Sequence, residues 1–326
     1  MKKTAREAVI LRVERLSPND GPGLRTVIFF KGCPLRCAWC STPESQNAYR
    51  ELYYKKNRCL GCGRCVSACP SKALSPASGA KKIMRDQSLC DECLVCAGVC
   101  PAGALGVYGE KMTVSDVMAL IRRDEIFYFH SSGGVTLSGG DALCYPDFAR
   151  ELLMSCKESG IHTMAELSVS RDYWRASMLI PFLDAYYVDI KLMNPENHLK
   201  WTGADNRDIL ANIRSVSREW PKRGLHARVP LIPGVNDSKS SVSETALFCK
   251  DLTNCRELEF LPYHRLGIST YRYLGRETPF AETPAMTFEE ALGKVEFLAE
   301  MKPPFPVKIA GQTVWTPNQP ICGDAV

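Results

Sequence analysis

The sequence predicts an α/β fold that is built on a parallel sheet and interrupted by a short cysteine-rich domain. Strand and helix patterns alternate from about residue 108 onward, as in parallel strands joined by crossover helices. Before that, the apolar run 26–30 (TVIFF) has the β-branched and aromatic content of a buried strand. Residues 51–107 carry closely spaced cysteines instead. We therefore expect a discontinuous α/β domain, 1–50 with 108–326, and an insert at 51–107.

Composition excludes several classes of protein. The 326 residues suffice for one large domain or two smaller ones, and 45% hydrophobic with 24% charged residues is ordinary for a soluble chain. A net charge of +5 without a Lys/Arg run predicts neither a nucleic-acid nor a membrane partner. Charged residues interrupt any signal-peptide core near the start. Sixteen cysteines in so long a chain then indicate metal binding in a reducing cytoplasm.

Three cysteines follow the 26–30 strand at the spacing C-x3-C-x2-C, namely Cys33, Cys37 and Cys40. Soft thiolates favour iron–sulfur clusters over hard cations. A four-iron cluster with three protein ligands keeps one iron open, as a catalytic metal site does. Structural zinc or buried free thiols are the alternatives. Gly32 and Pro34 bend the chain, so the cysteines are expected on a loop at the strand's carboxyl end, the catalytic face of β/α barrels.

The insert contains two four-cysteine runs, each ending in Cys-Pro, that match the bacterial two-cluster ferredoxin pattern. In that pattern the fourth cysteine of each run ligates the other cluster. The rule assigns one [4Fe–4S] cluster to Cys59, Cys62, Cys65 and Cys100, and a second to Cys90, Cys93, Cys96 and Cys69. A zinc ribbon that uses the inner Cys-x2-Cys pairs is the alternative.

The triplet, with Trp39 before its last cysteine and the preceding segment 20–25 (DGPGLR), resembles the radical S-adenosylmethionine (SAM) superfamily. Within it, the combination is similar to the glycyl radical enzyme activating enzymes. The resemblance implies a partial (β/α)6 barrel with a ferredoxin-like insert and three [4Fe–4S] clusters. It also implies anaerobic one-electron cleavage of SAM, bound at the open iron. The resulting 5′-deoxyadenosyl radical would take an α-hydrogen from a glycine of a large partner protein.

The same resemblance implies an electron donor such as flavodoxin or ferredoxin, with the insert serving electron delivery or partner docking. It assigns SAM contacts to Gly139 and Gly140, where the backbone approaches the methionine part closely, and to Asp141 beside its ammonium. Asp141 replaces the family's usual glutamate, a form similar to activating enzymes of some arylsuccinate-forming systems. Glu166 and Ser168 correspond to a corner that holds the SAM carboxylate. Leu167 replaces a threonine there, which weakens the case for a monovalent cation site.

Three further residues complete the predicted site. Asp189 and Lys191 lie two residues apart, so in a strand their side chains share one face. A structural ion pair is the alternative; the resemblance makes both face SAM and the incoming glycine loop. Arg228 presents a planar donor fork for carboxylates and corresponds to a family arginine near SAM or the substrate peptide. We predict Lys191, Asp189 and Arg228 as catalytic residues. His264 corresponds to a histidine that contacts SAM near the ribose.

The remaining expectations concern structure. Helices are expected at 114–121, from 146, at 209–220 and at 287–301, with a last strand at 305–309. Structural roles are expected for cysteines and histidines outside these motifs: Cys144, Cys156, Cys249, Cys255, His130, His162, His198 and His226, with Cys322 a spare thiol. Two other functions remain open. One is a radical SAM enzyme for a small molecule, marked by SAM turnover without a protein partner; the other is an electron-transfer module made of residues 59–101.

Overall fold

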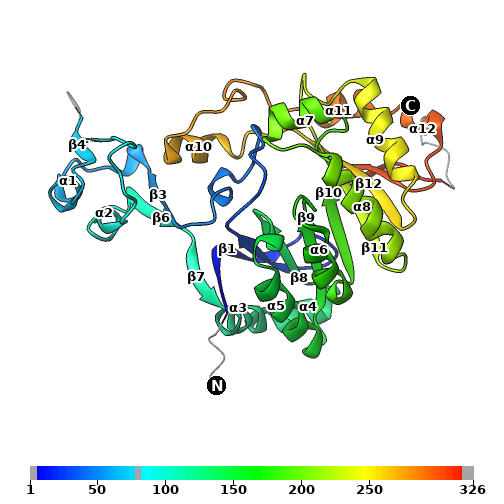
Figure 1. Ribbon diagram of the computed structural model, residues 1–326, viewed down its shortest axis with the longest axis horizontal. Helices are drawn as coiled ribbons and strands as arrows, with labels where there is room; N and C mark the ends of the chain where they lie inside the picture. Colours follow the sequence, from blue (N-terminus) through cyan, green and yellow to red (C-terminus); the bar gives the residue numbers. More distant parts are fainter. Residues whose placement is uncertain (1–5, 78–81, 318–326) are drawn as a thin grey trace.

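A computed structural model gives the fold and describes residues 6–77 and 82–317. Its centre is a ten-stranded sheet in the order β14-β13-β12-β11-β10-β9-β8-β2-β1-β7 (Figure 1). The strands of this sheet are β1 (Glu7–Ser17), β2 (Arg25–Phe30), β7 (Glu110–Thr113), β8 (Gly134–Gly139), β9 (His162–Leu167), β10 (Ala185–Asp189), β11 (Gly224–Leu231), β12 (Cys255–Pro262), β13 (Val307–Ile309) and β14 (Gln312–Trp315).

The middle of this sheet is parallel. Neighbouring strands from β2 through β8, β9, β10, β11 and β12 to β13 all pair in parallel. The outer strands β1, β7 and β14 pair antiparallel, so the sheet is mixed at its two edges. The predicted α/β class is confirmed. The parallel run in the described residues is one strand longer than six, because β13 at the predicted position 305–309 joins it.

Helices join these strands, and most of them cover the outer side of the sheet, whereas α10 lies toward the insert (Figure 1). They are α3 (Val114–Ile121), α4 (Glu125–Ser131), α5 (Pro146–Glu158), α6 (Tyr173–Leu179), α7 (Pro195–Thr202), α8 (Arg207–Glu219), α9 (Lys239–Lys250), α10 (Ile268–Leu274), α11 (Phe288–Val295) and α12 (Leu298–Met301). Thr113 caps α3 through a reciprocal capping box with Asp116. No helix among the described residues is both long and apolar enough to cross a membrane.

The prediction of one helix over 287–301 is wrong. The helix starts as expected, with Thr287 as its cap, but α11 ends at Val295 and α12 begins at Leu298. At Phe297 the backbone has φ −60° and ψ −18°, the geometry of a tighter 3₁₀ turn. Phe297 and Leu298 both pack against the core. The apolar residues that predict one continuous helix are thus buried by two helices with a turn between them.

The inner face of the sheet is polar. Along β11, half-buried and buried residues alternate, which places His226 and Arg228 on one face and apolar residues on the other. The apolar face packs beneath the helices as the main core. Glu259 lies on the neighbouring strand β12, and Glu166 lies two strands away on β9. Charged side chains therefore project into the concave side, where only pairing or a ligand makes their burial tolerable.

The insert has a small core of its own. It contains two antiparallel strand pairs and two short helices: β3 (Glu51–Tyr54) with β6 (Leu105–Tyr108), β4 (Leu74–Pro76) with β5 (Ile83–Arg85), α1 (Arg64–Ala68) and α2 (Val95–Gly98). Cysteine side chains and apolar residues such as Leu52 and Leu74 form this core. In Figure 1 the insert extends to one side of the main domain, with α1 at its outer end.

The two cysteine runs share one backbone course. Each has left-handed residues at three equivalent positions, which are Gly61 and Glu92, Gly63 and Leu94, and Lys72 and Gly103. Glycine adopts this conformation without steric cost, whereas other residues are strained by roughly 1–2 kcal/mol. Each run therefore repeats the same loop around its cysteines, even where its sequence lacks the glycine.

A buried ion-pair centre joins the insert to the main domain. Glu51, the first residue of β3, binds Lys31 Nζ at 3.0 Å and also pairs with Arg276. Lys31 is fully buried and immediately precedes Gly32 and Cys33. A second contact joins the two parts of the chain: the Gln87 side-chain amide of the insert donates to the carbonyls of Leu274 (3.2 Å) and Gly275 (3.0 Å) at the end of α10.

Candidate active site

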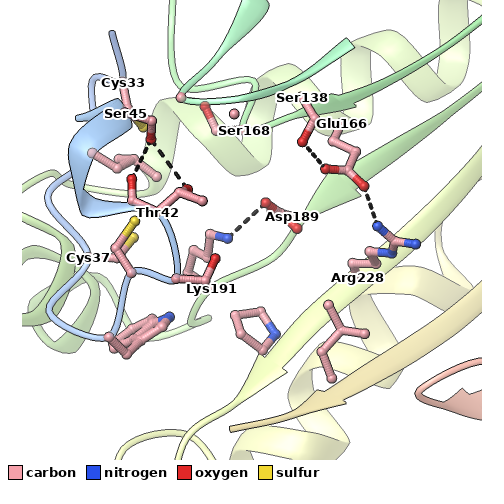
Figure 2. A pocket seen from close by; sticks show the side chains of 18 of the residues that line it. Cys33, Cys37, Thr42, Ser45, Ser138, Glu166, Ser168, Asp189, Lys191 and Arg228 are labelled. Atoms are coloured by element: carbon pink, nitrogen blue, oxygen red, sulfur yellow. Dashed lines mark hydrogen bonds and ion pairs between the residues drawn. The ribbon is translucent and has the colours of Figure 1, made fainter. Parts of the chain in front are cut away.

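The carboxyl ends of the parallel strands enclose a cavity of about 320 Å³ (Figure 2). Predicted site residues from distant parts of the chain line it together: Cys33, Cys37, Trp39, Cys40, Gly139, Gly140, Glu166, Ser168, Asp189, Lys191, Arg228 and His264. In Figure 2 the cysteine loop lies on one side and the Glu166–Arg228 pair on the other, with Asp189 and Lys191 between them. Asp141 is absent from the lining.

The cysteine loop is held from the sides by backbone and side-chain hydrogen bonds. The N–H of Gly32 donates to Ser45 O at 2.7 Å, and that of Ala38 to Trp201 O at 3.0 Å. The Tyr271 hydroxyl from α10 donates to Cys37 O at 3.2 Å, and the Thr278 hydroxyl to Ala38 O at 2.7 Å. These bonds leave the thiols free to face the cavity.

The three thiols line the cavity together, and soft thiolates favour an iron–sulfur cluster. Among the described residues, no group of three His, Cys, Asp or Glu side chains that could hold a single metal ion is found. Burial raises the pKa of Cys37 to about 12. Its proton is therefore released when a metal ion takes its place.

Gly139 and Gly140 occupy positions where no other residue fits. Gly139 has φ +101°, and a Cβ there would lie 2.5 Å from the Phe30 nitrogen. A Cβ on Gly140 would lie 2.2 Å from Gly32 O, on the cysteine loop itself. The two glycines thus allow β8 to lie close to β2 and to the cysteine loop at the edge of the cavity. Their close approach to the methionine part of SAM stays a prediction.

Asp141 lies behind this turn. Its carboxylate accepts the Leu143 N–H at 2.8 Å and the Ser168 hydroxyl, and the side chain is buried. Burial raises its pKa, although the Ser168 hydrogen bond opposes the shift. In this arrangement Asp141 positions Ser168, which does line the cavity. Its contact with SAM stays a prediction.

Arg228 is the centre of a polar network that the sequence motifs did not contain. Its guanidinium binds Glu166 at 2.5 Å and Glu259 at 2.8 Å, and stacks 3.6 Å above the Tyr187 ring centre. The Ser138 hydroxyl donates to Glu166 at 2.5 Å. Burial raises the pKa of Glu166 while Arg228 and Ser138 lower it, and the balance is a raised pKa. Strand alternation could have identified Glu259, because its register partner on β11 is Arg228.

Asp189 and Lys191 form an ion pair of 2.8 Å at the end of β10. Strand β10 ends at Asp189, so Lys191 belongs to the following loop and does not share a strand face with Asp189 as expected. The ion pair is the alternative named for these two residues, and their contact with SAM stays a prediction. Burial, the largest single effect, would lower the pKa of Lys191, but the Asp189 carboxylate together with Cys37 and Cys33 outweighs it, and the pKa is raised. An ammonium has three N–H donors, so an ammonium engaged by one carboxylate oxygen retains donors for a ligand.

The histidines divide as expected. His264 lines the cavity, and burial lowers its pKa. His198 is buried and its Nδ1 lies 2.6 Å from Ala204 O, while His226 pairs with Glu257 at 3.0 Å. Both therefore have structural partners. Cys322 lies outside the described residues.

In the described part of the insert, two further cavities divide its eight cysteines into two groups of four. One is lined by Cys59, Cys62, Cys65 and Cys100, together with apolar residues such as Tyr54 and Leu105. The other is lined by Cys69, Cys90, Cys93 and Cys96, together with Leu52 and Leu74. Each cavity holds the four cysteines that the exchange of the fourth ligand predicts.

Comparisons with known proteins agree with this site. The family model described as "Radical SAM superfamily" matches residues 27–245, which include the cysteine triplet and extend past Arg228. The chain belongs to this superfamily. An isethionate sulfite-lyase activating enzyme of Nitratidesulfovibrio vulgaris is 38% identical over 84% of this chain and 90% of its own length. A benzylsuccinate synthase activating enzyme of Thauera aromatica is 36% identical, over 85% and 86% of the two chains.

This radical SAM chain is thus an enzyme of the glycyl radical enzyme activating group. The crystal structure of a radical SAM methyltransferase from Sphaerobacter thermophilus covers 87% of this chain and 66% of its own, with a TM-score of 0.51 and 15% identity. That likeness concerns the fold alone. Because the family match lies mainly in the barrel, an electron-transfer module confined to residues 59–101 does not account for this chain.

The charge of the cavity also suits SAM. Its lining contains the three acids Asp20, Glu166 and Asp189 and the two cations Lys191 and Arg228, a difference of one negative charge. SAM carries two positive groups, an ammonium and a sulfonium, and one negative carboxylate, so its net charge is +1. A low-dielectric cavity strengthens such complementarity.

Proposed function

We propose that this radical SAM enzyme activates a large glycyl radical enzyme, in a cytoplasmic and anaerobic setting. The observation that carries the proposal is the single cavity that joins the cysteine triplet to Glu166, Asp189, Lys191 and Arg228 at the strand ends. When bound, the iron–sulfur cluster and SAM supply the 5′-deoxyadenosyl radical, which takes a hydrogen from a backbone glycine of the partner.

In this proposal the residues of the chain hold and orient. Cys33, Cys37 and Cys40 bind the barrel cluster and leave one iron for SAM. Lys191 offers its spare N–H donors to a carboxylate, and Asp189 offers an acceptor to an ammonium. Both oxygens of Glu166 are already engaged by Ser138 and Arg228, so we do not propose a monovalent cation there. His264 and Trp39 complete the lining around the bound nucleoside.

The two insert cavities support two more [4Fe–4S] clusters, on Cys59, Cys62, Cys65 and Cys100, and on Cys69, Cys90, Cys93 and Cys96. We propose that they pass electrons from a flavodoxin or ferredoxin to the barrel cluster. The partner glycyl radical enzyme is left at class level, because the isethionate-type and benzylsuccinate-type relatives are almost equally similar, at 38% and 36% identity. Asp141 alone does not decide between them.

The test is anaerobic. Reconstituted, chemically reduced protein is mixed with SAM and a candidate glycyl radical enzyme, and electron paramagnetic resonance should detect a glycyl radical doublet. Iron should be about twelve per chain, four for each of three clusters. Cys37→Ala should abolish SAM cleavage and keep roughly two thirds of the iron, because the insert clusters have their own ligands.

Two results would contradict the proposal. SAM cleavage without any radical on a protein partner, together with a tightly bound metabolite, would identify a small-molecule enzyme. Zinc in place of iron at the triplet would remove the chemical basis altogether. Cys156→Ala, a buried cysteine outside the three cysteine-lined cavities, is the matched control and should leave iron and SAM cleavage unchanged.

A further inference from the structure

Charge is divided unevenly between the two halves of the insert. Residues 52–85 contain eight basic residues and no acidic one: Lys55, Lys56, Arg58, Arg64, Lys72, Lys81, Lys82 and Arg85. Residues 86–110 contain four acidic residues and no basic one: Asp86, Asp91, Glu92 and Glu110. The whole-chain net charge of +5 conceals this division. A single-sign surface attracts a partner of opposite charge over about one Debye length.

An open groove lies between α1 of the basic half and α2 of the acidic half, and Arg64 is the charged residue in its lining. Cys62, Arg64, Ser67, Gly98, Val99 and Cys100 line this groove. Cys62 and Cys100 also line the inner cavity of the first cysteine set, so the groove and that cavity share a wall. Cys62 and Arg64 are exposed, as are Lys56 and Arg58 nearby in sequence. An exposed apolar side chain, Leu60, is 63% accessible in the same loop.

The second cysteine set faces the main domain instead. Its cavity is lined by Leu52 and Glu92. Leu52 follows Glu51, which binds Lys31 and Arg276 of the main domain. The first set lies at the far end of the β3–β6 ribbon, beside Tyr54 and Leu105. In Figure 1, α1, which follows Cys62 of the first set, lies farther from the main domain than α2. The first set is therefore the outer one, and the second set lies nearer the contact with α10.

We propose that an acidic one-electron carrier protein docks on the basic face formed by Lys56, Arg58, Arg64 and the α1–α2 groove, and reduces the cluster of the first cysteine set. The donor loses one electron and that cluster gains it, without a bond made or broken. This inference rests on the proposed function, because it requires both insert clusters. It adds the entry point of the electron and the charge of the donor's docking surface.

The test compares two triple variants of the full, reconstituted protein. Lys56→Gln/Arg58→Gln/Arg64→Gln removes three charges from the basic face. Arg122→Gln/Arg123→Gln/Lys250→Gln removes three exposed charges from the main domain and is the matched control. Stopped-flow absorbance follows reduction of each protein by a reduced flavodoxin and, separately, by a two-cluster ferredoxin. Calorimetry measures flavodoxin binding at low and high salt.

The basic-face variant should lose at least about tenfold in second-order reduction rate at low ionic strength, and most of its salt dependence. The control should stay within about twofold of the parent. Reduction and SAM cleavage driven by titanium(III) citrate should be equal in all three proteins. Equal donor rates for the two variants would overturn the inference, as would a basic-face variant that loses binding of the glycyl radical enzyme but not of the donor.

The docking inference and the proposed function fail separately. If the parent cleaves SAM with titanium(III) citrate and activates its partner, yet flavodoxin binding ignores the basic face, only the docking inference fails. If the parent contains about four irons per chain, the insert clusters and the docking inference fail together. If titanium(III) citrate drives no SAM cleavage, the proposed function fails, whatever the binding data show.

Discussion

Gly139 illustrates how one residue determines the shape of the site. Its φ of +101° lies outside the range that other residues adopt easily, and the space beside it is filled by the backbone of Phe30. Gly160 also has a positive φ, +70°, but nothing lies within 4 Å of the point where a Cβ would sit. Substitutions at these two glycines therefore distinguish the energetic cost of backbone strain from that of steric overlap.

Gly139→Ala should destabilise the protein by more than about 2 kcal/mol and disturb the cysteine loop, because strain and overlap add. Gly160→Ala should cost only the strain, about 1–2 kcal/mol. Urea denaturation measures both, and the iron content of the barrel site reports the loop. Equal costs for the two substitutions would show that the neighbouring backbone moves aside freely.

His162 gives the fold a pH dependence in the neutral range. Burial lowers the pKa of His162 below 6.5. The positive charges of Arg25 and Lys157 lower this pKa further, whereas the negative charge of Asp184 raises it. The native state thus keeps the ring neutral, while the unfolded chain takes up a proton near pH 6.5. Stability from this residue is complete above that pH and is lost as the pH falls toward the native pKa.

Between about pH 7.5 and 5.5 the parent should therefore lose more thermal stability than His162→Gln, whose side chain does not titrate. Melting temperatures of the two proteins across this range measure the difference. His130→Gln, at an exposed position on α4, is the control and should follow the parent. A parent and a His162→Gln variant with parallel pH profiles would contradict this role of His162.

At the residue scale, motif spacing identified most of the side chains that meet in the cavity, and it failed where partners come from other strands. Arg228 was predicted, but Glu259 and Tyr187, which hold it, belong to no motif. Asp141 was chosen by its place after two glycines; its carboxylate accepts the Leu143 N–H of the next turn, and its contact with SAM stays a prediction. A motif gives the position of a residue along the chain, and the register between strands decides its neighbours.

At the scale of elements, α10 connects the insert to the cysteine loop. Its Tyr271 hydroxyl donates to Cys37 O at 3.2 Å and lies 3.4 Å from Ala38 O. Tyr273, two residues further along the same helix, has the Lys55 ammonium of the insert 5.5 Å from its ring centre. The short helix thus contacts both parts, one tyrosine on each.

Tyr271→Phe should remove about 1 kcal/mol of hydrogen bonding and loosen the loop around Cys37. We expect faster loss of iron from the barrel site to a chelator, with the insert iron unaffected. Tyr273→Phe, on the same helix but directed at the insert, is the matched control. Chelator-release kinetics distinguish the two. Equal release rates would mean that the Thr278 hydrogen bond and the backbone hydrogen bonds of the loop secure it without Tyr271.

In the insert, the sequence predicted the grouping of the cysteines but not the backbone conformation around them. Cysteine spacing predicted which four side chains share each cavity, because ligand exchange between repeats is a property of the spacing. It did not predict that Glu92 and Leu94 adopt the left-handed conformation of Gly61 and Gly63. Local preference opposes that conformation, and the packing of cysteines into a common core outweighs it.

At the scale of the whole molecule, the main sheet and the insert have separate hydrophobic cores, and contacts between them must hold their relative position. Lys31 is fully buried and Glu51 is 6% exposed on its side chain, so their ion pair is shielded from solvent. Burial lowers the pKa of Lys31, although Glu51 opposes the shift. Lys31 directly precedes the cysteine loop, and Glu51 begins the insert. Breaking this pair should therefore affect both domains, whereas replacing both members should not.

Glu51→Leu should cost about 3–5 kcal/mol, because it leaves the Lys31 charge buried without its partner. Lys31→Met/Glu51→Leu should recover most of that loss, since two apolar side chains need no partner. Arg276, 25% exposed, can turn toward water in both variants and so cancels from the comparison. Denaturation followed at once by tryptophan fluorescence and by cluster absorbance should give coincident transitions for the parent and the double variant, and separated ones for Glu51→Leu. Coincident transitions in all three would mean that the α10 seam, with Gln87, suffices to couple the insert to the barrel.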